Sequence, residues 1–318
     1  MAVLVGIDEA GFGPILGPLI VSSSTFALSP NLLETDLWQI LRRSVSNQVK
    51  GLLGRLLITD SKKAKNKTYG IKHLQRTVLA ALKCLDKNPS NFLELLEILS
   101  PDCIEHAAEY PWYKKIALYP LAVNKDDISI ASGVFTDDLS SNGIRLLEIK
   151  SKCLDVGHYN RLVGDVKNKS NVLFTIVCQL LQNAFDKFGT DDLHIIVDRQ
   201  GGKDYYATSL KRMFPQMDLK IINEDKIRSS YELRDAGKKG LIHFVVEADN
   251  CFLPVSLASM ASKYIRELFV DNINLYFKAF KPQLKATAGY WTDGTRFIEE
   301  LKKIPDLKFN ANQLVRLK

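Results

Sequence analysis

Four acidic side chains, at three separate points of the sequence, have the chemistry for a metal site. Asp8 and Glu9 are adjacent and follow an apolar run rich in branched residues, while Asp198 and Asp249 each follow a later apolar run. Short apolar runs of this kind are typical of buried strands. In α/β sheets, sites form in the loops beyond the strand ends. If these three strand ends lie side by side, the four carboxylates converge.

Converging carboxylates need a counter-charge. Two like charges about 4 Å apart repel by roughly 1 kcal/mol in water and by several times more in a protein cleft. Protons or cations must therefore neutralise such a cluster. Oxygen ligands suit Mg²⁺ or Mn²⁺ rather than zinc or copper. Two such ions, about 3.5–4 Å apart, would activate a water and stabilise the leaving oxygen in phosphodiester hydrolysis. For Asp8 and Glu9 alone, an ordinary solvated strand end is the alternative.

A nucleotide-binding loop is a competing interpretation of the first motif. Residues 11–17 have the spacing G-x-G-x-x-x-G, one residue longer than the dinucleotide fingerprint. Pro14 would disrupt the amides at a helix start, and Asp8 and Glu9 would repel a pyrophosphate. The five histidines show no metal-binding spacing. We expect most of them to be surface or structural residues.

Two further groups have both a functional and a structural interpretation. A run of lysines suits backbone phosphates, or else it is a solvated helix face. An aromatic cluster could stack on bases, or else it is the core of an insertion. The lysines are Lys62, Lys63, Lys65 and Lys67, and the aromatic residues are Tyr110, Trp112 and Tyr113.

The elements that must position these residues alternate along the chain. An early hairpin followed by alternating strands and helices favours α/β layers with a mixed sheet. Residues 88–145, which contain four prolines, are irregular and predict an inserted subdomain. We expect strands over 3–7, 19–26, 56–58, 144–153, 194–198, 219–222, 229–234 and 241–247. We expect helices over 32–53, 74–82, 167–188, 205–214 and 294–303, and a long helix from Pro254.

Composition narrows the class of protein. With 318 residues, 46% of them hydrophobic, the chain can bury one large core or two modest ones. Its net charge of +7 favours an anionic partner, nucleic acid first. Five scattered cysteines without a C-x-x-C pair are typical of reduced thiols in a cytosolic protein. The longest apolar run is far below the roughly 20 residues that span a bilayer. We expect a soluble, cytoplasmic protein with no membrane contact.

Five motifs occur in order along the chain. They are Gly6-Ile-Asp-Glu-Ala-Gly-Phe-Gly-Pro14 with Gly17-Pro18, Asp60-Ser-Lys-Lys63, Val197-Asp198, Ala248-Asp249 with the small-residue segment Val255–Lys263 and Arg266-Glu267, and Gly289-Tyr290 with Thr292 and the helix through Phe297. Taken in order, they resemble type-2 ribonuclease H (ribonuclease HII). The resemblance spans residues 3 to about 303, and no counterpart is recognised for 88–145.

The resemblance implies a ribonuclease-H-like mixed sheet with flanking helices, formed by residues 1–318 as one domain with an insertion at about 88–145. It implies Mg²⁺- or Mn²⁺-dependent cleavage of RNA paired with DNA, and of ribonucleotides embedded in duplex DNA. The implied metal-binding catalytic acids are Asp8, Glu9, Asp198 and Asp249. The implied substrate contacts are Gly11, Phe12 and Gly13 at the ribose 2′-hydroxyl, Lys62 at a phosphate and Tyr290 on a sugar.

The chain also departs from the family's pattern. Phe12 stands where the family has arginine, and Arg-Gln-Gly-Gly follows Asp198 in place of the usual glycine. Two alternatives therefore stay open: a nucleic-acid-binding protein of the same fold that does not cut, and a metal nuclease for another structure, such as a DNA junction or flap. Keeping four mutually repelling carboxylates favours an enzyme. The choice of metal, the preferred substrate and the oligomeric state stay open.

Overall fold

A seven-stranded mixed sheet forms the centre of the fold in the computed structural model, which describes residues 1–65, 68–121, 124–201 and 203–317. The strand order is β5-β2-β1-β6-β9-β8-β7. The strands are β1 (Ala2–Ala10), β2 (Leu19–Leu28), β5 (Arg145–Leu154), β6 (Asp192–Asp198), β7 (Asp218–Glu224), β8 (Arg228–Asp235) and β9 (Lys238–Val245).

The pairing brings three carboxyl ends to the same edge of the sheet. β1 runs antiparallel to β2, which confirms the early hairpin, and parallel to β6. β6 in turn runs parallel to β9, with Asp198 opposite Val245. The mixed α/β sheet is therefore as the sequence predicts. Sites in such sheets form beyond the carboxyl ends of parallel strands.

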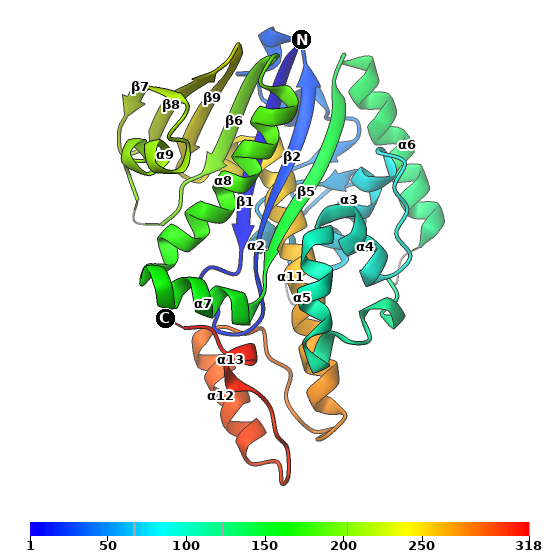
Figure 1. The fold of residues 1–318 in the computed structure, drawn as a ribbon. Helices are drawn as coiled ribbons and strands as arrows, with labels where there is room; N and C mark the ends of the chain where they lie inside the picture. Colours follow the sequence, from blue (N-terminus) through cyan, green and yellow to red (C-terminus); the bar gives the residue numbers. More distant parts are fainter. Residues whose placement is uncertain (66–67, 122–123, 202, 318) are drawn as a thin grey trace.

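Helices cover both faces of the sheet (Figure 1). The long helix α11 (Leu253–Lys278) packs on one face, against β1 and β2. The other face is covered by α7 (Val156–Val166), α8 (Lys169–Phe188) and α9 (Ala207–Met213). Alternate residues of β1 serve the two cores: Val3, Val5 and Ile7 pack with α8, and Leu4 packs on the α11 side. α8, α9 and α11 lie where the sequence predicts helices.

Residues 88–145 pack against the outer side of α11. They form α4 (Phe92–Leu99), α5 (Ile104–Ala108), α6 (Lys125–Ser141) and three single turns, beside α3 (Lys72–Lys83). Tyr110, Trp112 and Tyr113 are buried, and the Tyr113 and Phe269 ring centroids lie 4.8 Å apart. These aromatic side chains are thus core residues and not a base-stacking surface. The division into one domain with an insertion stays a prediction.

The helix predicted over 32–53 is wrong. This segment contains only the four-residue α1 (Leu37–Ile40), followed by β3 (Val45–Ser46), which pairs in parallel with β4 (Leu56–Leu57). The Ser44 hydroxyl donates a 2.7 Å hydrogen bond to Asp138 of α6, and the Ser44 carbonyl accepts one from Leu56. Contacts with distant segments therefore override the helical spacing of the apolar residues.

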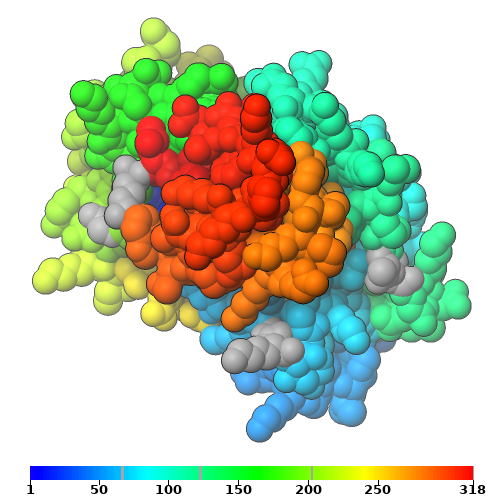
Figure 2. All heavy atoms as spheres, turned by 90° about the horizontal axis from the view of Figure 1, so that it is seen from below, coloured from blue at the N-terminus to red at the C-terminus, as the bar shows by residue number. Residues whose placement is uncertain are grey.

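The C-terminal residues lie below the sheet. α12 (Trp291–Lys302) and α13 (Ala311–Leu314) lie beside α7, and in Figure 2 this red segment sits between the green and orange parts of the chain. All five cysteines are free, as expected. No helix in the described residues is long and apolar enough to cross a membrane.

Candidate active site

All nine residues predicted for the site line a single cavity of about 220 Å³ at the carboxyl end of β1. They come from five segments that are far apart in the sequence. The predicted residues are Asp8, Glu9, Gly11, Phe12, Gly13, Lys62, Asp198, Asp249 and Tyr290. The structure also adds Asp60, Ser61, Ser259 and Lys263 to the lining.

The four predicted acids reach the cavity in three different ways. Asp8 and Glu9 lie within β1, two residues and one residue from its end, and the Glu9 amide donates a 2.7 Å hydrogen bond to Asp8 Oδ1. Asp198 is the last residue of β6 and accepts a 2.8 Å hydrogen bond from the Ala248 amide. The sequence predicts that Asp249 ends a strand, and this is wrong, because β9 stops at Val245. Asp249 lies in the four-residue helix α10 (Ala248–Cys251).

Burial and mutual repulsion raise the pKa of every acid in this cluster. Burial, with the charges of Glu9 and Asp198, raises the pKa of Asp8 well above its usual range. Burial raises the pKa of Glu9 to about 7. Burial and the charge of Asp249 raise the pKa of Asp198 to about 7. Burial and the charge of Asp60 raise the pKa of Asp249. The cluster therefore lacks the positive charge that would stabilise its ionised form.

Lys62 is a predicted cation that lines the cavity together with these acids. Its ammonium opposes the rise in the pKa of Glu9, Asp198 and Asp249. It lies in the short helix α2 (Ser61–Ala64), where the Asp60 side chain accepts a 2.8 Å hydrogen bond from the Lys62 amide.

The other lysines of this run have different surroundings. Lys63 donates to Asn250, and Lys65 forms a 2.5 Å ion pair with Glu267 of α11. Lys67 lies outside the described residues. Among the described lysines of this run, Lys62 is therefore the one that lines the cavity.

A row of serines on α11 supports the acids from below. Ser256 donates to the Asp249 carbonyl, and Ser262 donates to the Asp8 carbonyl at 3.0 Å. The Ser259 hydroxyl donates to Ser61 at 3.1 Å and opposes the rise in the pKa of Asp8. The spacing of three residues places all three on one face of the helix. Their individual roles are not predicted from the sequence. Their signal was small polar residues repeating every third position in an otherwise apolar helix.

The Gly11–Pro18 loop closes one side of the cavity. Gly11 has a φ of +98°, and a Cβ there would lie 2.8 Å from the Arg266 side chain and from the Pro18 carbonyl. The loop leads into a strand and not into a helix, which excludes the dinucleotide-binding interpretation. Phe12 is half-buried, and the Lys169 ammonium at the start of α8 lies 5.1 Å from its ring centroid.

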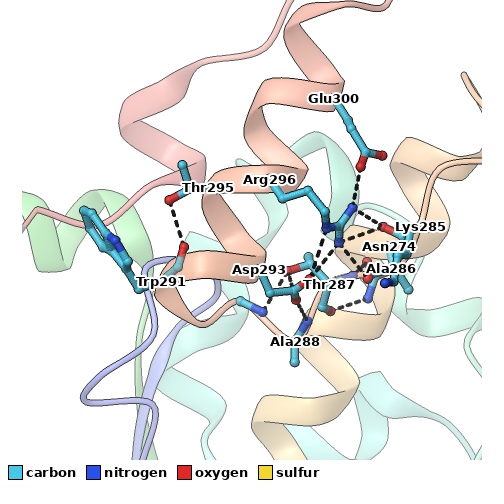
Figure 3. A network of polar contacts seen from close by, with 11 residues as sticks. Asn274, Lys285, Ala286, Thr287, Ala288, Trp291, Asp293, Thr295, Arg296 and Glu300 are labelled. Carbon is cyan, nitrogen blue, oxygen red and sulfur yellow. Dashed lines mark hydrogen bonds and ion pairs between the residues drawn. The ribbon is translucent and has the colours of Figure 1, made fainter.

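A polar network joins residues 285–288 to the first turns of α12 (Figure 3). Asp293 accepts hydrogen bonds from the Thr287 hydroxyl at 2.7 Å and from the Ala288 amide at 2.8 Å, and it pairs with Arg296 at 2.7 Å. This network fixes the segment just before Tyr290, whose ring is 48% exposed. The Tyr290 hydroxyl lies 3.5 Å from the Lys263 ammonium.

The donor types in this cavity fit a hard divalent cation. Carboxylate oxygens are the ligands that Mg²⁺ and Mn²⁺ prefer, and raised carboxyl pKa values are the mark of a missing positive charge. Within the described residues, no three His, Cys, Asp or Glu side chains already stand together as a metal-binding group. The cavity therefore fits the cation in donor type, and binding requires the carboxylates to turn toward one another.

Comparisons with known proteins find a likeness only among solved structures. No family model matches the chain, and no curated protein matches it. The ribonuclease H2 of Pyrococcus horikoshii OT3 is 14% identical, with 98% of this chain and 92% of that chain covered and a TM-score of 0.48.

Two further solved structures are similarly distant. Bst-RNase HIII in complex with Mn²⁺ is 13% identical, with 99% of this chain and 66% of that chain covered and a TM-score of 0.43. The structure of the PCNA:RNase HII complex from Archaeoglobus fulgidus gives a match that is 14% identical, with 99% of this chain and 94% of that chain covered and a TM-score of 0.43. At these identities and TM-scores the likeness assigns no activity to this chain.

Proposed function

We propose that this chain is an endonuclease that uses Mg²⁺ or Mn²⁺ to hydrolyse phosphodiester bonds of RNA in RNA/DNA hybrids, or at ribonucleotides embedded in duplex DNA. One observation carries the proposal. Residues from five distant segments, selected from the sequence for this chemistry, line a single cavity in which burial and neighbouring charge raise the pKa of four carboxyls.

The four carboxylates would hold the cations. Two bound ions would activate a water for in-line attack and stabilise the leaving oxygen. Because burial holds the pKa of Glu9 and of Asp198 at about 7, these groups must release protons before they bind a cation. Cation binding should therefore tighten as the pH rises through this range. The hydrogen bond from Ser262 would keep the Asp8 backbone in place during that exchange.

The remaining lining residues would hold the substrate. The exposed Lys62 ammonium would pair with a phosphate, and the Tyr290 ring would pack on a sugar. The backbone of Gly11 and Gly13 would contact the ribose 2′-hydroxyl, which distinguishes RNA from DNA. Phe12 adds an apolar surface beside them. The net charge of +7 favours the approach of a polyanion to this site.

A cleavage panel tests the proposal. End-labelled RNA/DNA hybrid, a DNA duplex with one ribonucleotide, an all-DNA duplex and a DNA flap are incubated with the purified chain and either metal. We expect nicks only in the first two, and we expect Asp198→Asn to abolish them. Glu299→Gln, which changes an exposed acid on α12, is the matched control and should cut like the wild type.

Each other outcome of the panel has a definite meaning. Cutting of the flap alone would replace the proposed substrate with a DNA structure, and Phe12 would be the first residue to examine. Salt-sensitive binding that Asp198→Asn leaves unchanged, without cleavage in either metal, would indicate a binding protein of the same fold.

A further inference from the structure

Two buried arginines contact the Gly11–Pro18 loop and do not line the cavity. Arg266 of α11 is fully buried, and Arg316, which follows α13, is 4% exposed. Burial lowers the pKa of Arg316 to about 9, and the nearby Arg266 charge adds to the effect. In the part of the chain that the structure describes, no carboxylate forms an ion pair with either guanidinium.

Their partners are backbone carbonyls of the segments that border the cavity. Arg266 Nη2 donates to the Leu16 carbonyl at 3.0 Å and to the Ala288 carbonyl at 3.2 Å. Arg316 Nη2 donates to the Pro14 carbonyl, and the Arg316 amide donates to the Ile15 carbonyl at 2.8 Å. The two side chains thus connect the loop to α11, to the segment before Tyr290 and to the C-terminal residues.

The loop is held between these contacts and the cavity. Gly289 accepts hydrogen bonds from the Ile15 and Leu16 amides, and Leu16 forms an antiparallel bridge with Val315. The Arg266 side chain packs directly on the backbone of Gly11, whose other side lines the cavity. A shift of either guanidinium would therefore move the backbone that faces the cavity.

Two buried guanidinium groups without charged partners lower the free energy of unfolding. The Nε and Nη1 groups of both arginines have no hydrogen-bond partner among the described residues. Buried charges without a charged partner destabilise a fold, and apolar side chains of similar volume usually pack as well or better. Departures from favourable packing are expected mainly where function requires them.

We infer that Arg266 and Arg316 are positioning residues that hold the Gly11–Pro14 backbone in place for substrate recognition, so that residues 311–317 are part of the site. The inference rests on the proposed function. The loop lines the cavity, whereas residues 311–317 do not. The two arginines would therefore affect the discrimination between ribose and deoxyribose, which the proposed function assigns to the loop backbone.

Arg316→Met tests the inference, with Asn160→Ala as the matched control. Methionine keeps an unbranched side chain of similar reach but removes the hydrogen bond to Pro14. Asn160 holds the same C-terminal segment, through Asn312, Val315 and Leu317, without contacting the loop. Both variants loosen the segment, whereas only Arg316→Met removes a side-chain hydrogen bond to the loop.

The readout is the ratio of dissociation constants for an all-DNA duplex and for the same duplex with one ribonucleotide, measured in EDTA. We expect Arg316→Met to lower this ratio about tenfold or more, and Asn160→Ala to leave it unchanged. Arg316→Ala should regain part of the ratio when guanidinium is added at millimolar concentration. An equal effect of Arg316→Met and Asn160→Ala, or an unchanged ratio in Arg316→Met, would overturn the inference.

Amide hydrogen exchange without substrate separates this inference from the proposed function. Exchange at residues 11–16 should be at least tenfold faster in Arg316→Met than in Asn160→Ala. If the wild type neither binds nor cuts the ribonucleotide duplex but this difference is present, the proposed function fails and the positioning role stands. Equal exchange in the two variants rejects the positioning role, whatever the wild type cuts. Arg266→Met, which removes the hydrogen bonds to the Leu16 and Ala288 carbonyls, serves in the same comparison if Arg316→Met does not fold.

Discussion

Two groups of uncompensated charge lie next to the Gly11–Pro18 loop. They differ in sign, in their access to the cavity and in their hydrogen-bond partners. On one side, Asp8, Glu9, Asp198 and Asp249 face a cavity, and burial with mutual repulsion raises their pKa values. On the other side, two arginine side chains are enclosed, and backbone carbonyls accept their hydrogen bonds. Both groups lower the stability of the fold.

The two groups differ in whether a ligand can stabilise their charge. A buried cation whose donors end on backbone carbonyls holds the chain in one conformation. Like charges that face a cavity gain by binding an ion of opposite sign. The acids therefore indicate where a ligand binds, and the arginines hold the loop that borders this site.

A pair of glycine substitutions should separate the two sides of the loop most strongly. Gly11→Ala puts a methyl group 2.8 Å from the Arg266 side chain at a φ of +98°, and should lower the free energy of unfolding by about 2–4 kcal/mol. A Cβ on Gly13 meets nothing within 4 Å, so Gly13→Ala should change stability by less than about 0.5 kcal/mol.

Activity should distinguish the two variants further. Gly13→Ala, folded normally, should lose cleavage efficiency because its methyl group occupies the open cavity. Denaturant unfolding and kcat/KM on the ribonucleotide duplex measure the two effects. Full activity of Gly13→Ala would show that substrate does not approach this side of the loop.

The stability of the metal-free protein should depend on pH through the acid cluster. Asp8, Glu9 and Asp198 have pKa values above those of the unfolded chain, which lie near 4. From about pH 4 to pH 7 the folded state retains protons that the unfolded state has lost. The free energy of unfolding therefore falls as the pH rises through this window.

Asp198→Asn should remove part of this dependence. Asparagine can still accept the Ala248 hydrogen bond, and the variant should be about 1–2 kcal/mol more stable than the wild type at pH 8 in EDTA. The advantage should shrink toward pH 4. Urea unfolding at several pH values measures it, and a variant less stable than the wild type at pH 8 would contradict the account.

The smallest expected effect concerns Lys169. Its ammonium lies over Phe12 at the edge of the cavity, where it can meet a substrate phosphate. Lys169→Gln should reduce the salt dependence of nucleic-acid binding by about one unit of slope and weaken binding less than about tenfold. Lys278→Gln, at the distant end of α11, should leave the slope unchanged. Equal slopes in the two variants would remove Lys169 from the interface.

The sequence predicted the parts of this molecule that local patterns determine. Short apolar runs predicted the strands β1, β6 and β9. The acids that follow these runs predicted the position of the cavity. The helix predicted over 32–53 was wrong because pairing with residues 56–58 and the contact with Asp138 decide that segment. Asp249 was placed on a strand end because a four-residue helix has no periodic signal.

The arginines under the loop could not have been predicted. Arg316 contacts Pro14 across 302 positions of sequence, and nothing in its neighbours marks it as buried. Arg266 was noted only as part of a motif. Asp60 stood in a motif that pointed to Lys62, and its proximity to Asp249 required the fold. Long-range contacts of single polar side chains leave no periodic trace in a sequence.

Mn²⁺ binding, followed by electron paramagnetic resonance, tests most directly whether the acids form a ligand site. The wild type at pH 8 should bind about two ions saturably. Asp198→Asn should weaken that binding at least tenfold, and Glu299→Gln should leave it unchanged. A wild type without saturable Mn²⁺ binding, or equal binding by the wild type and Asp198→Asn, would contradict the account.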